Sequence, residues 1–83
     1  LSVEEQNNDN AFTVYPNPSE GLFYIKTTTN LNQSAHLFDL NGRLVQQFNL
    51  KGKLNTLELD ALQKGIYFLK IEGFKQPKKL IIY

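Results

Sequence analysis

The feature that most constrains this chain is the regular punctuation of its apolar segments. From residue 11 onward, short runs rich in Val, Ile, Phe, Tyr and Thr are interrupted by Gly, Pro and Asn. The interruptions recur at intervals of roughly 8–12 residues, which is typical of an all-β sandwich or barrel. No window keeps the helical period of about 3.6 residues. The pattern therefore predicts an all-β fold.

The same pattern predicts about seven antiparallel strands in a single Ig-like, Greek-key β-sandwich. Alternate residues of a strand point to opposite faces, so Tyr67, Leu69 and Ile71 would share one face of their strand. The expected strands cover residues 12–15, 21–27, 34–40, 43–50, 54–59, 66–71 and 78–82.

The chain has room for one domain, since it is only 83 residues long. Residues 1–10 are acidic and amide-rich, which predicts a solvated linker, and residues 11–83 would form the folded domain. The sequence has no initiator Met and no signal peptide, so we expect it to be a piece of a longer protein.

The turn at Asp39-Leu40-Asn41-Gly42 allows two hairpin registers. A type I′ turn at Asn-Gly would pair Leu37 with Gln46. A type I turn with Gly42 in the left-handed region would pair Asp39 with Arg43 and Leu37 with Val45. The second register opposes apolar to apolar and acid to base, so it is the one predicted.

A second local pattern runs from Leu62 to Tyr67. Gly65 can adopt a positive φ, and Tyr67 follows two residues into the next strand. This arrangement is typical of the corner of Greek-key sandwiches. It predicts that the Tyr67 ring is buried while its hydroxyl bonds a backbone group of the preceding turn.

The composition provides few residues for catalysis or ligand binding. The net charge is +1 and there is no Cys, so nucleic-acid binding and thiol chemistry are not expected. The only histidine, His36, is expected on the solvent side of a strand, and Asp39 and Asp60 are explained by turns. No apolar run is long enough for a membrane span. We expect no catalytic, metal or cofactor site.

Two segments are better suited to recognition. The two prolines of Tyr15-Pro16-Asn17-Pro18 stiffen the segment and hold Asn17 in a defined place. At the other end of the chain a basic pair precedes an apolar strand that could be recognised by strand addition. This second segment consists of Lys78, Lys79, Leu80, Ile81 and Ile82.

Six aromatic residues suggest an alternative. An exposed row of rings would favour an accessory carbohydrate-binding module, or a fibronectin-like one, beside a catalytic domain. The six are Tyr15, Phe23, Tyr24, Phe38, Phe68 and Phe74.

Four blocks in a fixed order cover residues 11–83, and together they resemble the type A C-terminal sorting domains of the type IX secretion system of Bacteroidota. The first block is Val14–Pro18 with Gly21 after it. The second contains Asp39, Gly42 and Arg43; the third contains Leu62, Gly65 and Tyr67; the last is Lys78–Ile82.

The resemblance implies that the domain is a secretion signal for an attached cargo protein. A cargo domain would precede residues 1–10 and would pass through the periplasm to the cell surface or medium. The outer-membrane machinery of the type IX system would recognise the domain, and a sortase-like peptidase would then remove it. The expected recognition residues are Tyr15, Pro16, Asn17, Pro18, Lys78, Lys79, Leu80, Ile81 and Ile82.

Overall fold

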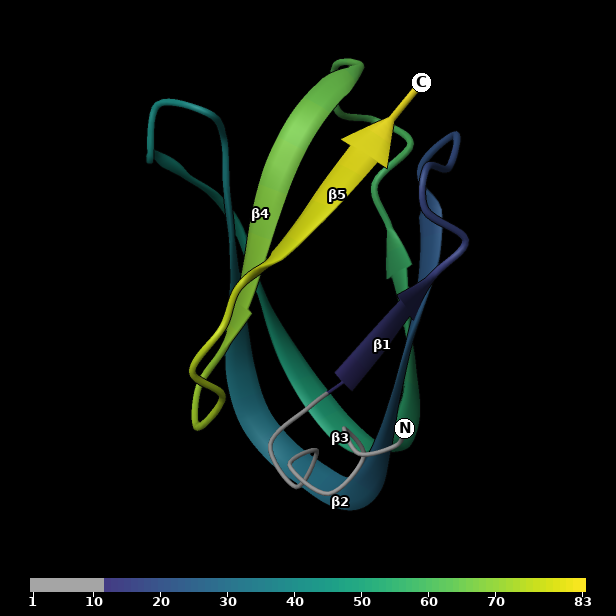
Figure 1. Cartoon of the computed structure of the whole chain (residues 1–83), viewed down its shortest axis with the longest axis vertical. Coiled ribbons are helices and arrows are strands. Elements are labelled where there is room, and N and C mark those ends of the chain that lie inside the picture. The colour runs from purple at the N-terminus through teal and green to yellow at the C-terminus, as the bar shows by residue number, and fades with distance from the viewer. Residues whose placement is uncertain (1–11) are drawn as a thin grey trace, which may run out of the picture.

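A computed structural model describes residues 12–83, which form one curled antiparallel sheet (Figure 1). Strand β2 is central, because it pairs with β1, β3 and β4, and β5 extends the sheet beyond β4. The prediction of an all-β antiparallel fold is confirmed. The strands are β1 (Phe12–Tyr15), β2 (Leu22–Phe38), β3 (Leu44–Glu58), β4 (Gly65–Ile71) and β5 (Lys78–Ile82).

The described residues form five strands, and the seven-strand Ig-like sandwich is not confirmed. Strand β2 covers most of the two expected strands 21–27 and 34–40, and β3 covers most of 43–50 and 54–59. Both long strands bend without leaving the sheet. The β2–β3 register shifts between Lys26 and Leu31, opposite Gly52, whose φ of 76° allows the bend in β3.

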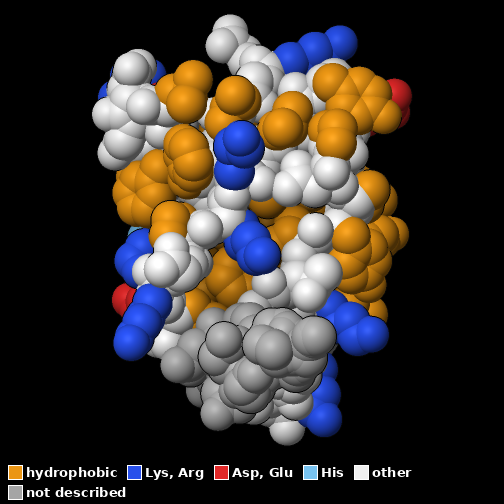
Figure 2. All heavy atoms as spheres, viewed as in Figure 1, with side chains coloured by type: hydrophobic (Ala, Val, Ile, Leu, Met, Phe, Trp, Pro, Cys, Tyr) orange, Lys and Arg blue, Asp and Glu red, His pale blue; other side chains and the backbone are white. Residues whose placement is uncertain are grey.

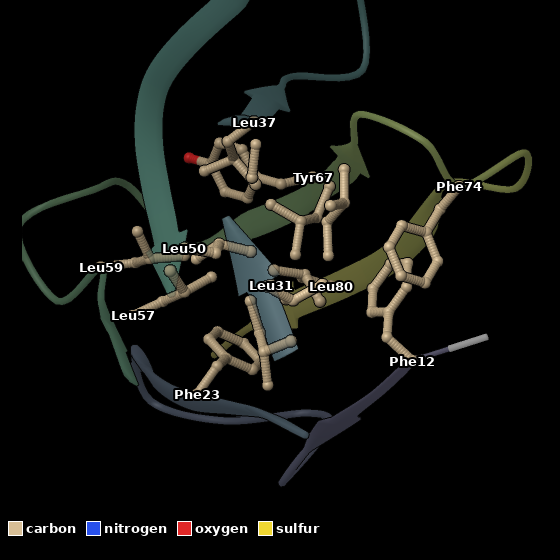
Figure 3. Packing of buried hydrophobic residues seen from close by; sticks show 14 of the residues in the cluster. Phe12, Phe23, Leu31, Leu37, Leu50, Leu57, Leu59, Tyr67, Phe74 and Leu80 are labelled. Atoms are coloured by element: carbon tan, nitrogen blue, oxygen red, sulfur yellow. The ribbon is translucent and has the colours of Figure 1, made fainter. Parts of the chain in front are cut away.

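The bend brings the two halves of the sheet over one another. The first half of β2 pairs with β1 and the end of β3, and the second half pairs with β4 and the start of β3. The inner side of the curl holds a single hydrophobic core (Figure 3). The core consists of Phe12, Phe23, Ile25, Leu31, Ala35, Leu37, Leu50, Leu57, Leu59, Tyr67, Leu69, Ile71, Phe74, Leu80 and Ile82.

Strand alternation decides which residues enter this core. In β4, Tyr67, Leu69 and Ile71 are buried, as expected for residues that share one face. In β2, Phe23 and Ile25 are buried between outward-facing neighbours. Each fully buried side chain of this size contributes about 1.5–3 kcal/mol.

The turn after β2 follows the predicted type at its tip. The Gly42 N–H donates to the Asp39 carbonyl oxygen at 3.0 Å, and Gly42 has a φ of 82°. The Asp39 N–H donates to the Arg43 carbonyl oxygen at 3.0 Å, so these two residues oppose each other as predicted. The predicted pairing of Leu37 with Val45 is wrong.

A bulge causes that difference. Phe38 pairs with Leu44 but Leu37 pairs with Gln46, so Val45 is an extra residue in β3. The extra residue leaves Leu37 fully buried and Gln46 exposed on the neighbouring strand. A bulge of this kind adds local twist, which a sheet that curls this tightly requires.

Gly21 marks the entry into β2 and touches the chain beyond β3. The Leu59 N–H donates to the Gly21 carbonyl oxygen at 2.7 Å. Gly21 has a φ of 133°, and a Cβ there would lie 2.6 Å from the Cα of Asp60. Only glycine fits both the conformation and the space.

We predict that Gly21→Ala lowers the free energy of unfolding by about 3 kcal/mol or more, because strain and a backbone clash combine. Gly42→Ala is the matched control, since a Cβ at Gly42 meets nothing within 4 Å. It should cost only the backbone strain, about 1–2 kcal/mol. Urea unfolding of both variants checks this; equal losses would contradict the close packing described at Gly21.

Candidate functional site

The turns that carry the sequence motifs gather at one end of the molecule. Figure 1 shows the connections before β2, after β2 and after β3 at the same end as the C-terminus. Gly21 packs against Asp60, and Gly65 pairs with Ile82 in the sheet. Blocks that are far apart in the sequence therefore form one surface.

Asn17 joins the proline segment to the last strand. Its Nδ2 donates to the carbonyl oxygen of Lys79 at 2.7 Å, and its Oδ1 accepts from the N–H of Ile81 at 3.1 Å. One side-chain amide thus bonds two backbone groups on the outer edge of β5, as a neighbouring strand would.

Ser19 continues this contact with its backbone. Its N–H donates to the Ile81 carbonyl oxygen and its carbonyl oxygen accepts from the Tyr83 N–H, both at 2.9 Å. The result is a parallel bridge between Ser19 and Ile82. The Ser19 hydroxyl accepts from the N–H groups of Gly21 and Leu22 at 3.1 Å, which fixes the turn into β2.

These three bonds to β5 and one to Tyr83 bring the two predicted recognition segments together. We call residues Tyr15–Ser19 with Lys78–Tyr83 the C-terminal site. Sequence analysis predicted an outer edge of β5 that is accessible to strand addition. That prediction is wrong between Lys79 and Tyr83, because Asn17 and Ser19 already occupy the edge.

The side chains of β5 divide between the core and the surface. Leu80 and Ile82 are buried, whereas Lys78 and Lys79 are exposed. The Lys78 Nζ lies 5.8 Å from the centre of the Phe12 ring, within range of a cation–π interaction. On the face formed by β1 and β5, basic side chains stand among hydrophobic ones (Figure 2).

A shallow hollow adjoins the C-terminal site. It has a volume of about 430 Å³ and is lined by Pro16, Pro18, Leu22 and Tyr83, among others. Tyr15 and Tyr24 pack together beside it across β1 and β2, with ring centres 5.6 Å apart. The proline segment therefore offers an apolar, partly exposed surface.

The corner predicted at residues 62–67 is confirmed. Tyr67 is 8% exposed, and its hydroxyl donates to the Gln63 carbonyl oxygen at 2.6 Å. Gly65 has a φ of 155°, and Leu62 packs against the core. Together these contacts fix the direction in which the chain enters β4.

Asp39 organises the turn that faces this corner. Its carboxylate accepts from the Asn41 N–H at 2.9 Å, the Arg43 N–H at 3.0 Å and the Arg43 Nε at 3.2 Å. The bond from the Arg43 N–H is the main reason that the pKa of Asp39 lies below its ordinary value. The carboxylate is therefore ionised at neutral pH and holds the turn.

A groove of about 540 Å³ separates the two motif turns. It is lined by residues 39–41, 43, 45 and 61–67. The groove thus brings the second and third sequence blocks onto one surface. Asp39, Arg43, Gly65 and Tyr67 give this end its shape, which is the structural role expected of them.

In the described part of the chain, the other candidate residues for catalysis or metal binding do not lie together. His36 is half-buried and stacks on Phe38, with ring centres 6.3 Å apart. Within residues 12–83, no group of three or more metal-ligating side chains is found. The same residues contain no helix long and apolar enough to cross a membrane.

The six aromatic residues do not form an exposed row. Phe23 and Phe74 are buried in the core. Tyr15 and Tyr24 lie on the β1–β2 part of the sheet, whereas Phe38 pairs with Phe68 on the β2–β4 part. The predicted linker, residues 1–10, lies outside the described residues.

The role of Ser19 was not predicted from the sequence. Ser19 is 5% exposed and closes the sheet against Ile82. The available signal was its place between Pro18 and Gly21, where a hydroxyl can satisfy the backbone of a turn. Its backbone partners Ile81 and Tyr83 are more than 60 residues away in the sequence, and no local pattern indicates them.

A comparison with protein families shows that residues 13–83 match the model of a family described as a secretion system C-terminal sorting domain. The match covers nearly all of the described residues and confirms the resemblance found in the four sequence blocks. No curated protein matches the chain.

We predict that Asn17→Ala lowers the free energy of unfolding by about 1–2 kcal/mol, because two hydrogen bonds to β5 are lost. Asn17→Asp is the matched variant, since its carboxylate can accept from Ile81 but cannot donate to Lys79. It should unfold more easily than the native chain. Chemical denaturation checks both, and a native-like midpoint for Asn17→Ala would contradict the role given to this amide.

Proposed function

Because the chain belongs to the family of secretion system C-terminal sorting domains, we propose that it directs an attached cargo protein through the type IX translocon. Membership of this family gives the chain the role of a C-terminal secretion signal. It implies an association with the type IX machinery and with a cargo protein, and export to the cell surface or extracellular space. The family is one of signal domains and not of enzymes.

The proposed route has four steps. The cargo and the folded domain reach the periplasm, the outer-membrane machinery recognises the domain, and both cross the outer membrane. A sortase-like peptidase then cuts on the N-terminal side of the sheet, within residues 1–10 or before them. The compact core supports this order, because a folded domain can present a surface that an unfolded tail cannot.

The proposed recognition surface is the C-terminal site. The observation that carries it is the set of four hydrogen bonds that join Asn17 and Ser19 to β5 and Tyr83. They hold the proline segment against the last strand, so a receptor that contacts one contacts the other. Lys78 and Lys79 are exposed beside this junction and provide the charge.

The receptor would therefore contact a surface formed jointly by the proline segment and the last strand. Exposed lysines supply long-range attraction and orientation, whereas apolar side chains supply the area that is buried on binding. Tyr15 and Tyr83 are 40% and 58% exposed, which is high for aromatic residues. The buried Leu80 and Ile82 would act through the fold, because their side chains face the core.

We predict that the double substitution Lys78→Glu and Lys79→Glu in a reporter fused to residues 1–83 abolishes or strongly reduces secretion across the outer membrane. Both side chains are exposed, so the domain should still fold. The measurement is the fraction of reporter in the medium and on the cell surface, compared with the periplasmic fraction.

Lys64→Glu with Lys75→Glu is the matched control, because it changes the net charge equally at exposed positions outside the C-terminal site. This control should be secreted normally. Thermal unfolding of both purified variants must show a folded domain. Normal secretion of the Lys78 and Lys79 variant would contradict the proposed recognition surface.

A further inference from the structure

The two long edges of the sheet differ. In the strand order β3-β2-β4-β5, the outer edge of β5 is occupied by Asn17 and Ser19. Strand β3 lies on the opposite edge and, within residues 12–83, pairs only with β2. An unpaired strand edge presents N–H and C=O groups that can bind another strand.

The first half of β3 has the composition of a strand that pairs readily. The segment Leu44–Leu50, LVQQFNL, has no charged residue, no glycine and no proline. Leu44 is 53% exposed, and Val45 and Phe48 are half-buried. Short uncharged segments of this kind are those most prone to strand addition when they lie on an edge.

The sheet register shows which backbone groups face outward. The Glu72 N–H donates to the Ser34 carbonyl oxygen at 2.9 Å, so the backbone groups of Ser34 point toward β4. The next residue, Ala35, must point toward β3, where it pairs with Phe48. The neighbours of Phe48 therefore direct their N–H and C=O groups to the open edge. They are Gln47 and Asn49.

Contacts with other residues mark both ends of the open segment Leu44–Leu50. At one end Arg43 is bound to the Asp39 carboxylate. At the other end the Lys51 N–H donates to the Asn55 side chain at 3.0 Å, so the edge is no longer free there. Lys51 and Lys53 are exposed at this second end. The edge is therefore apolar and amide-rich, with positive charge beside one end.

The charges also disfavour a second copy as the partner. If two β3 strands paired antiparallel about Gln47, Lys51 of each copy would lie opposite Arg43 of the other, whose charge is already matched by Asp39. A second copy would therefore bring no unpaired acidic side chain to Lys51. A strand with acidic residues at the corresponding end would instead be attracted.

We propose that the open edge of β3 over Leu44–Leu50 binds an extended strand of a partner protein that is uncharged in its middle and acidic at the end facing Lys51 and Lys53. The partner strand would bond the backbone groups of Gln47 and Asn49 and extend the sheet beyond β3. This surface lies on the opposite edge of the sheet from β5, and the proposal does not depend on the secretion role.

The test uses the full chain and two synthetic peptides. Each peptide alternates Thr and Val over seven residues; one begins with two Glu and the other with two Lys, so that antiparallel pairing places the charged pair beside Lys51 and Lys53. We expect the Glu peptide to bind at least tenfold more tightly in fluorescence anisotropy. In heteronuclear NMR spectra, its largest shifts should fall on Leu44–Leu50.

Two variants separate backbone pairing from charge. Gln47→Pro removes one outward N–H without touching the β2–β3 hydrogen bonds, and should weaken binding at least tenfold. Lys51→Glu with Lys53→Glu should reverse the preference, so that the Lys peptide binds more tightly. These lysines are exposed, and this second variant does not put folding at risk.

Several results would overturn the proposal. They are the absence of binding, shifts that fall on Lys78–Tyr83 instead, equal affinity for both peptides, or unchanged binding by a folded Gln47→Pro variant. Concentration-dependent dimerisation through Leu44–Leu50 in sedimentation experiments would also overturn it, because the occupant would then be a second copy. The peptide test does not measure secretion, so its outcome is independent of the secretion test of the C-terminal site.

Discussion

The structure depends on the closure of a curled sheet by the segment between β1 and β2. Asn17 and Ser19 form four hydrogen bonds with the outer edge of β5 and with Tyr83 just after it. Without them, the strand that contributes Leu80 and Ile82 to the core would have β4 as its one sheet neighbour within residues 12–83. A small domain has few other contacts to hold an edge strand, so this closure is central to both stability and shape.

Closure also explains why the sequence blocks of the family lie where they do. Gly21 permits the close approach of β2 to Asp60, Asp39 fixes the turn after β2, and Tyr67 fixes the turn into β4. All these turns are at the end of the molecule where the chain finishes. The blocks thus lie on one surface of a domain whose family is described as a secretion system C-terminal sorting domain.

Local signals in the sequence predicted local structure. The Asp39–Arg43 turn, the Tyr67 corner and the alternation in β4 are properties of adjacent residues, and the structure bears them out. The bend that merges seven expected strands into five depends on pairing between distant segments. The bulge at Val45 lies within the hairpin itself, but the turn residues alone did not reveal it. The contact of Asn17 with Lys79 and Ile81 spans more than 60 residues, so no local pattern could reveal it.

The most direct test of the account is amide hydrogen exchange along the two edges of the sheet. If Asn17 and Ser19 close the β5 edge, the Ile81 and Tyr83 amides should exchange slowly, although they lie at an edge and near the end of the chain. The Gln47 and Asn49 amides on the open β3 edge should exchange much faster. Fast exchange at Ile81 and Tyr83, similar to that at Gln47, would contradict closure of the sheet.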